Sequence, residues 1–160
     1  LRRSRVLNLS PARVEITLRI VAAHRAERVL VFHEDVEACA VIHEVLLASG
    51  IKAVLYHSGL PARTRAEALS EYRQGKSNVL VTCRALDEGF NVPETEVGII
   101  AASTATRRQR IQRLGRVLRP AEGKDGALVY TLVATNPEID RLRSEEVEME
   151  GVASVSWSQA

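Results

Sequence analysis

Five short runs of apolar and β-branched residues divide this chain, and segments with helical spacing lie between the first three of them. Continuous apolar runs, unlike runs that alternate with polar residues, are typical of strands covered on both faces of a sheet. Strands that alternate with helices form parallel sheets. The sequence therefore predicts an α/β fold, a parallel sheet with helices on both faces. The predicted strands are Val29–Phe32, Ala53–Tyr56, Val79–Thr82, Val97–Ala101 and Leu128–Val133.

Glycines mark the ends of the two helices that are predicted between the first three strands. Gly50 and Gly75 each follow a segment with apolar residues at helical spacing, and glycine commonly ends a helix. The predicted helices cover residues 10–26, 35–49, 61–74 and 137–149. Their predicted inward-facing residues are Val14, Leu18 and Val21, then Ala38, Val41, Ile42, Val45 and Leu46, then Ala62, Ala66, Leu69 and Tyr72.

The length and composition fit one globular domain. The chain has 160 residues, of which 46% are hydrophobic and 26% charged, and 1–160 is predicted as a single domain with a core at 10–134 and an extension at 135–160. No apolar run approaches the ~18 residues of a membrane-spanning helix. We therefore expect a soluble protein without membrane association.

The cysteines and histidines show no metal-ligand spacing. Two cysteines, Cys39 and Cys83, fall in different predicted elements, which favours a reducing cytoplasm over a disulfide scaffold. Cys83 has no neighbouring base and is interpreted as a loop residue rather than a nucleophile. The histidines His33, His43 and His57 are predicted to be surface or loop residues.

Positive charge is concentrated in one segment, although the net charge of +2 does not by itself indicate nucleic-acid binding. Residues 106–120 have helical spacing, with Ile111, Leu114 and Leu118 on the side expected to face the sheet. Another side carries Gln112, Arg116 and Arg119. Arginine remains charged and donates hydrogen bonds in a fork that suits phosphate, so two of these residues could neutralise a transferring phosphoryl group as arginine fingers.

The sequence of this segment resembles motif VI of the superfamily 2 helicases, Q-R-x-G-R-x-x-R. The matching residues are Gln112-Arg113-Leu114-Gly115-Arg116-Val117-Leu118-Arg119. Upstream, residues 79–93 resemble motif V, and the strand at 29–32 resembles motif IV. The resemblance covers about residues 10–133, in the expected motif order. It implies a RecA-like fold and the second, C-terminal lobe of a two-lobed helicase or translocase, closest in wording to the XPB-like and restriction-type branch.

The resemblance also implies an ATP site shared between two lobes. Arg116 and Arg119, with Gln112, would be its catalytic residues, and Gly89 and Asn91 would bind the nucleotide beside them. Many relatives have aspartate in place of Asn91, so this chain keeps a hydrogen-bonding group and loses a charge. The magnesium of ATP would be held by the N-terminal RecA-like lobe of the same polypeptide. This chain has no G-x-x-x-x-G-K-[ST] loop, so we expect no ATP hydrolysis by the chain alone.

Nucleic acid is the expected partner, with DNA favoured over RNA. Thr82 at a strand end, the Ser58-Gly59 turn, and Arg63 or Arg65 on the following helix would hold backbone phosphates without reading bases. Two other interpretations stay open from the residues. One is a RecA-like lobe without motor activity that binds nucleic acid or protein, and the other is a nucleotide-binding enzyme of flavodoxin-like or Rossmann type.

Overall fold

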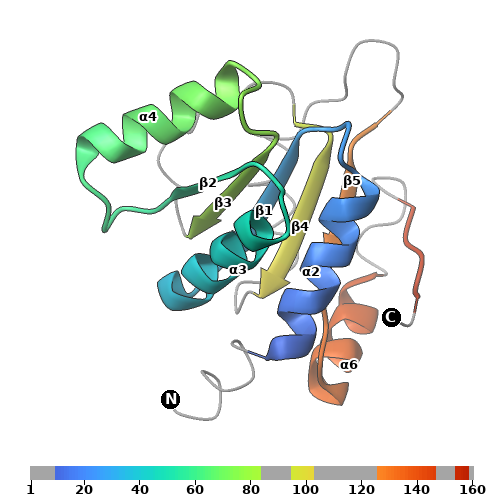
Figure 1. The fold of residues 1–160 in the computed structure, drawn as a ribbon. Coiled ribbons are helices and arrows are strands. Elements are labelled where there is room, and N and C mark those ends of the chain that lie inside the picture. The colour runs from blue at the N-terminus through green and yellow to red at the C-terminus, as the bar shows by residue number, and fades with distance from the viewer. Residues whose placement is uncertain (1–9, 84–94, 103–125, 147–153, 159–160) are drawn as a thin grey trace.

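A computed structural model describes residues 10–83, 95–102, 126–146 and 154–158, and the fold is given for these residues. Its centre is a five-stranded sheet with the strand order β2-β3-β1-β4-β5 (Figure 1). Every neighbouring pair is parallel. The strands are β1 (Val29–His33), β2 (Ala53–Tyr56), β3 (Val79–Cys83), β4 (Val97–Ala102) and β5 (Leu128–Thr131). All five predicted strands are confirmed, and β5 ends two residues earlier than predicted.

The helices begin and end close to the predicted positions. They are α2 (Pro11–Ala23), α3 (Val36–Ala48), α4 (Ala62–Arg73) and α6 (Asn136–Glu146). The side chain of Asp35 caps α3 by accepting a hydrogen bond from the Ala38 N–H at 3.1 Å. Gly50 and Gly75 follow α3 and α4 with φ values of 72° and 70°, a conformation that favours glycine. Their predicted role in ending the helices is confirmed.

Two apolar clusters lie on opposite faces of the sheet. Helices α2 and α3 cover one face, and α4 covers the other (Figure 1). Side chains from single strands divide between the clusters: Val79 and Val81 of β3 belong to the first and Leu80 to the second. This division explains the continuous apolar runs, because both sets of alternating side chains are buried. The predicted α/β class, with helices on both faces, is confirmed.

The rotation of α4 differs from the prediction. Of the four residues predicted to face inward, Tyr72 is buried and Leu69 half-buried, as predicted, whereas Ala62 and Ala66 are exposed and Ala68 is buried in their place. The phenol of Tyr72 is completely covered and lies 2.9 Å from the Thr95 hydroxyl. Burying this large ring turns the helix toward the Tyr72 side, since its area outweighs that of two alanines.

Helix α3 shows a smaller difference of the same kind. Val41 was predicted to face inward but is exposed, and Cys39 is fully buried in its place. The other predicted inward residues are buried or half-buried: Ala38, Ile42, Val45 and Leu46.

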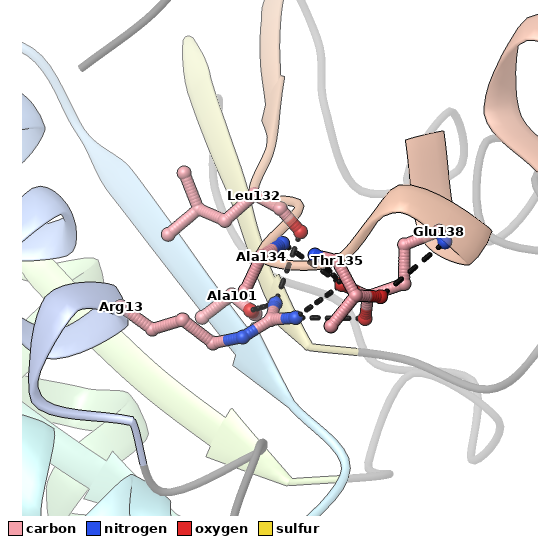
Figure 2. A network of polar contacts seen from close by, with 6 residues as sticks. All are labelled: Arg13, Ala101, Leu132, Ala134, Thr135 and Glu138. Atoms are coloured by element: carbon pink, nitrogen blue, oxygen red, sulfur yellow. Dashed lines mark hydrogen bonds and ion pairs between the residues drawn. The ribbon is translucent and has the colours of Figure 1, made fainter. Parts of the chain in front are cut away.

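A buried arginine joins helices α2 and α6 to the sheet (Figure 2). Arg13 of α2 is only 2% exposed. Its Nη1 donates hydrogen bonds to the carbonyl oxygens of Ala101, at 2.5 Å, and Leu132, at 3.0 Å. Its Nη2 lies 2.7 and 2.8 Å from the two carboxylate oxygens of Glu138 on α6. A charge this deeply buried is stable only when its hydrogen bonds are made, and these four bonds supply most of them.

The same carboxylate organises the start of α6. Glu138 Oε2 accepts hydrogen bonds from the N–H groups of Ala134, at 2.8 Å, and Thr135, at 3.1 Å. In return, the Glu138 N–H donates to the Thr135 hydroxyl at 3.4 Å, which is the reciprocal pattern of a capping box. The segment that was predicted as an extension is therefore tied to the sheet through Arg13.

Glu138 should make the stability of the fold depend on pH. Burial by itself would raise the pKa of Glu138, but the Ala134 N–H and the charge of Arg13 outweigh burial and lower this pKa below 4.5. A depressed folded pKa gives stability that is present above about pH 4.5 and is lost as the pH falls through the lowered value. We therefore expect Glu138→Gln to have a lower melting temperature than the wild type at neutral pH. The difference between the two melting temperatures should decrease as the pH falls below about 4.5.

Thermal unfolding followed by circular dichroism over a pH series would measure this difference. Asp140→Asn is the matched control, since it makes the same chemical change at an exposed position of α6. A gap between wild type and Glu138→Gln that stays constant below pH 4.5 would contradict the assignment.

Candidate functional site

The carboxyl ends of the parallel strands meet at one edge of the sheet. His33, Tyr56, Cys83 and Ala102 are the last residues of β1, β2, β3 and β4. In open parallel sheets this edge is where ligands bind, because the loops that follow the strands converge there. The candidate site is therefore built from the residues that follow these four positions.

The turn after β2 exposes backbone groups at this edge. The Leu60 N–H donates to the His57 carbonyl at 3.1 Å and closes the turn, which leaves Ser58 and Gly59 exposed. Helix α4 begins directly afterwards, and its first internal bond runs from the Arg65 N–H to the Pro61 carbonyl at 3.0 Å. The N–H groups that precede this bond have no partner within the helix, and such groups bind anions such as phosphate.

Gly59 also allows a close approach. A Cβ atom built on Gly59 would lie 3.1 Å from Nδ1 and 3.2 Å from Cε1 of the His57 ring. A larger residue would press against this ring, which would have to give by a few tenths of an ångström, so the packing of the turn favours glycine.

Three buried polar atoms near this turn have no hydrogen-bond partner among the described residues: His57 Nδ1, Arg65 Nε and Thr82 Oγ1. Tyr56 is their common neighbour. The Arg65 guanidinium lies 6.0 Å from the centre of the Tyr56 ring, Thr82 pairs with Tyr56 in the β2–β3 register, and His57 follows Tyr56 in the chain. Buried polar atoms are nearly always satisfied, so a group of orphaned atoms indicates a place for a polar ligand.

The predicted nucleic-acid contacts differ in accessibility. Ser58 and Gly59 are exposed, and the side chain of Arg63 is 90% exposed. Arg63 Nε donates to Glu67 Oε1 at 2.8 Å, but an ion pair this exposed contributes little and can be exchanged for a phosphate. Thr82 is 0% exposed, with Phe32 and Tyr56 as its partners on the neighbouring strands. Contact between its hydroxyl and a phosphate would require the covering side chains to move, and its role stays a prediction.

The predicted ATP-binding and catalytic residues lie outside the described residues. Gly89 and Asn91 belong to the segment 84–94, and Gln112, Arg116 and Arg119 to the segment 103–125. The described chain ends at Cys83 before the first segment and at Ala102 before the second, both at the carboxyl edge. Their roles remain predictions.

The interpretation of the histidines as surface or loop residues was wrong for His33, which is a buried strand residue, whereas His57 lies in the loop after β2 as predicted. His33 is 1% exposed, and its Nδ1 accepts a hydrogen bond from the Asp35 N–H at 3.0 Å. His57 is also buried, whereas His43 is half-buried with its Nε2 3.0 Å from the Ala53 carbonyl oxygen. The local hydrogen bond satisfies His33 Nδ1, whereas His57 Nδ1 has no partner among the described residues, and neither state can be read from sequence spacing.

Cys83 is the last residue of β3 and is buried, so its interpretation as a loop residue was also wrong. A hydrogen bond to Cys83, together with burial, raises the pKa of the Cys39 thiol far above its ordinary value. Thiols that resist ionisation are poor nucleophiles. Both cysteines are free, and among the described residues no group of three His, Cys, Asp or Glu side chains could hold a metal ion. No described helix is long and apolar enough to cross a membrane.

Known proteins resemble this chain both in sequence and in structure. The family described as the helicase conserved C-terminal domain matches residues 12–121. The DNA 3'-5' translocase XPB2 of Sulfurisphaera tokodaii is 31% identical over 120 residues, which are 75% of this chain and 26% of that protein. The pre-mRNA-processing ATP-dependent RNA helicase PRP5 of Kluyveromyces lactis is 29% identical over 101 residues, or 62% of this chain and 12% of that protein. This chain thus spans about a quarter or less of either relative's length.

The solved structures agree on the fold. The C-terminal domain of the DEAD-box protein Dbp5 has a TM-score of 0.74 to this chain, at 17% identity, covering 90% of this chain and 82% of that domain. The described sheet and helices are therefore RecA-like, as the sequence resemblance implied. Family match and fold together show that this chain belongs to the helicase conserved C-terminal domain family.

Proposed function

We propose that this chain is the second lobe of an ATP-dependent nucleic-acid helicase or translocase, which supplies one side of an ATP site and part of a nucleic-acid track. The observation that carries the nucleic-acid half is the group of orphaned polar atoms beside the exposed turn at 58–59. Phosphate satisfies such atoms together with the free N–H groups at the start of α4. The contacts would be to the backbone alone and therefore independent of base sequence.

The residues of this phosphate site come from two adjoining elements. Ser58 and Gly59 present backbone groups, Arg63 offers an exposed guanidinium, and Arg65 lies beside Tyr56 with its Nε unpaired among the described groups. Arg65, which the sequence left as an alternative to Arg63, thus joins the proposed site. Thr82 would contribute after a shift of the side chains that cover it.

The ATP half rests on the motif resemblance. Arg116 and Arg119 would stabilise the charge that develops on the transferring phosphoryl group, Gln112 would act beside them, and Gly89 and Asn91 would contact the nucleotide. Both segments that carry these residues follow strand ends at the same edge of the sheet. We assign the magnesium of ATP to the first lobe, since the family resemblance implies that the G-x-x-x-x-G-K-[ST] loop lies there.

DNA is the favoured nucleic acid, because the motif sequences and the similarity to the DNA translocase XPB2 both favour a DNA translocase. The RNA helicase PRP5 shows that related chains occur in RNA helicases as well, so the binding test should compare both nucleic acids. A lobe without motor activity is the alternative that an ATP hydrolysis assay of the full-length protein would distinguish. We place the protein in the cytoplasm, since Cys39 and Cys83 are free thiols.

Binding of single strands by this chain should be weak, sensitive to salt and indifferent to sequence. Arg63→Gln should reduce the slope of log affinity against log salt by about 0.7, the change expected when the protein neutralises one fewer phosphate of a single strand. Arg73→Gln is the matched control, because Arg73 is exposed on the same helix but lies at its other end. Fluorescence anisotropy with labelled oligonucleotides of several sequences, in DNA and RNA form, would measure these slopes.

Two results would count against the proposed phosphate site. The first is a strong preference for one base sequence, which contacts to the backbone cannot give. The second is an equal reduction of slope in Arg63→Gln and Arg73→Gln, which would show that charge anywhere on α4 matters and not the turn at its start.

A further inference from the structure

The end of β4 contains an irregularity beside the central strand. Along most of the β1–β4 pair the register is regular, and Phe32 pairs with Ile100. The next residue of β1, His33, pairs with Ala102, so the register skips Ala101. One extra residue on one strand is a β-bulge, which bends the strand and changes the direction in which it continues.

The bulge lies at a position where ligand sites form in sheets of this type. The connection after β1 leads toward β2 on one side of the sheet, whereas the chain after β4 leads toward β5 on the other. The loops therefore diverge between β1 and β4, and a crevice opens at such a point at the carboxyl ends of the strands. The segment 103–125 begins one residue after the bulge ends.

Arg13 is the hydrogen-bond partner of the bulged residue. Ala101 is completely buried, and its carbonyl oxygen accepts a hydrogen bond from Arg13 Nη1 at 2.5 Å (Figure 2). The same nitrogen donates to the Leu132 carbonyl at 3.0 Å, just beyond β5. A buried carbonyl without a partner is costly, so the bulge at Ala101 depends on a donor reaching it from α2.

The two terminal nitrogens of the Arg13 guanidinium have separate roles. Nη1 serves the sheet through Ala101 and Leu132, whereas Nη2 serves α6 through Glu138. A planar fork can hold both sets at once, and a lysine ammonium has a single nitrogen for the same acceptors. The bond to the bulge and the bond to α6 can therefore be tested separately.

We propose that Arg13 is a positioning residue for ATP turnover: its bond to the Ala101 carbonyl maintains the bulge and so sets the direction in which the chain leaves β4 toward residues 103–125. The inference rests on the proposed function, which assigns Gln112, Arg116 and Arg119 of that segment to the ATP site. Misplacing a catalytic group by about 1 Å can reduce turnover about a hundredfold, so a shift of one residue at the exit of β4 is large enough to matter.

Arg13→Met/Glu138→Gln tests this role directly. The double change removes the donor to Ala101 without leaving the half-buried carboxylate of Glu138 unpaired. Nuclear magnetic resonance of this chain should show His33 paired with Ala101 in place of Ala102, the regular register. In the full-length protein, turnover at saturating ATP should fall between about tenfold and a hundredfold at a temperature where the variant stays folded.

Glu138→Gln alone is the informative companion, because it weakens the link to α6 and keeps the bond from Arg13 to Ala101. We expect it to keep the His33–Ala102 pairing and wild-type turnover. If Arg13 served stability only, both variants would keep the register, and any loss of turnover would follow their melting temperatures. Should the double variant not fold, Arg13→Lys replaces it and should show the same change of register in part of the molecules.

Either of two outcomes overturns the inference: an unchanged His33–Ala102 pairing in a folded variant that lacks the donor, or a changed pairing with full turnover. The proposed function fails separately, if Arg116→Ala and Arg119→Ala retain turnover, and the register measurement is unaffected because it involves no ATP.

Discussion

Replacing Arg116 or Arg119 with alanine in the full-length protein should lower ATP turnover about a thousandfold while leaving the fold intact. The expected size is that of an arginine finger, which contributes at least about 10³ to turnover by neutralising charge in the transition state. The sequence spacing predicts a helix whose sheet-facing side carries Ile111, Leu114 and Leu118 and whose other side carries Arg116 and Arg119, so we expect neither arginine to be needed for packing. A coupled assay of phosphate release, with and without single-stranded DNA, would measure the effect.

Arg110→Ala is the control for this experiment. It belongs to the same arginine-rich segment, but at 100° per residue it would fall on a different side of the predicted helix from Arg116 and Arg119. Its turnover should stay close to that of the wild type. Turnover near the wild-type rate in Arg116→Ala and Arg119→Ala would end the arginine-finger assignment, and an absence of turnover in the wild type itself would favour the lobe without motor activity.

Leu30→Ala should destabilise the fold by about 2–5 kcal/mol, the range for removing a large aliphatic side chain from a packed interior. Leu30 is in β1, the central strand, and is 0% exposed within the cluster under α4. The cavity would lie between the sheet and a helix, where neither can collapse far into it. Urea unfolding followed by circular dichroism gives the free energy of unfolding directly.

Val36→Ala supplies the comparison, since Val36 is also aliphatic but is 44% exposed at the start of α3. Its free energy of unfolding should stay within about 0.5 kcal/mol of the wild type, as for most surface changes. Equal losses for Leu30→Ala and Val36→Ala would mean that the two-cluster core is described incorrectly.

The strands could be predicted because both faces of most of them are buried, which leaves an uninterrupted apolar run in the local sequence. Val79, Leu80 and Val81 are all buried, two on one face and one on the other, so the run is apolar without interruption. Gly50 and Gly75 marked helix ends for an equally local reason, a positive φ. The inward face of α4 was predicted only in its second half, at Leu69 and Tyr72, since spacing permits several rotations and the fit of the Tyr72 ring against the sheet decides among them.

The sequence predicts where the residues of the candidate site lie along the sheet, but not how deeply each of them is buried. The turn at Ser58 and Gly59 and the helix after it follow a strand directly, so their place at the carboxyl edge follows from topology. The orphaned Thr82 hydroxyl is a property of packing, because its neighbours Phe32 and Tyr56 come from two other strands. No periodicity or motif carries that information.

Arg13 was missed for the same reason. Its signal was weak but present: Arg13, Thr17 and Val21 recur at four-residue intervals and form the buried face of α2. A charged residue on such a face must find its partners inside the fold. Those partners lie 88 and 125 residues further along the chain, and only the structure brings them together.

Helix α6 determines where this domain can be truncated for expression, because its Glu138 pairs with Arg13. A boundary after residue 134, at the point where strands stop alternating with helices, would remove Glu138. The buried guanidinium of Arg13 would then lose its counter-ion. Truncated versions would then carry an uncompensated buried positive charge beneath α2, which is strongly destabilising. Recombinant forms of this lobe should accordingly extend at least through Glu146.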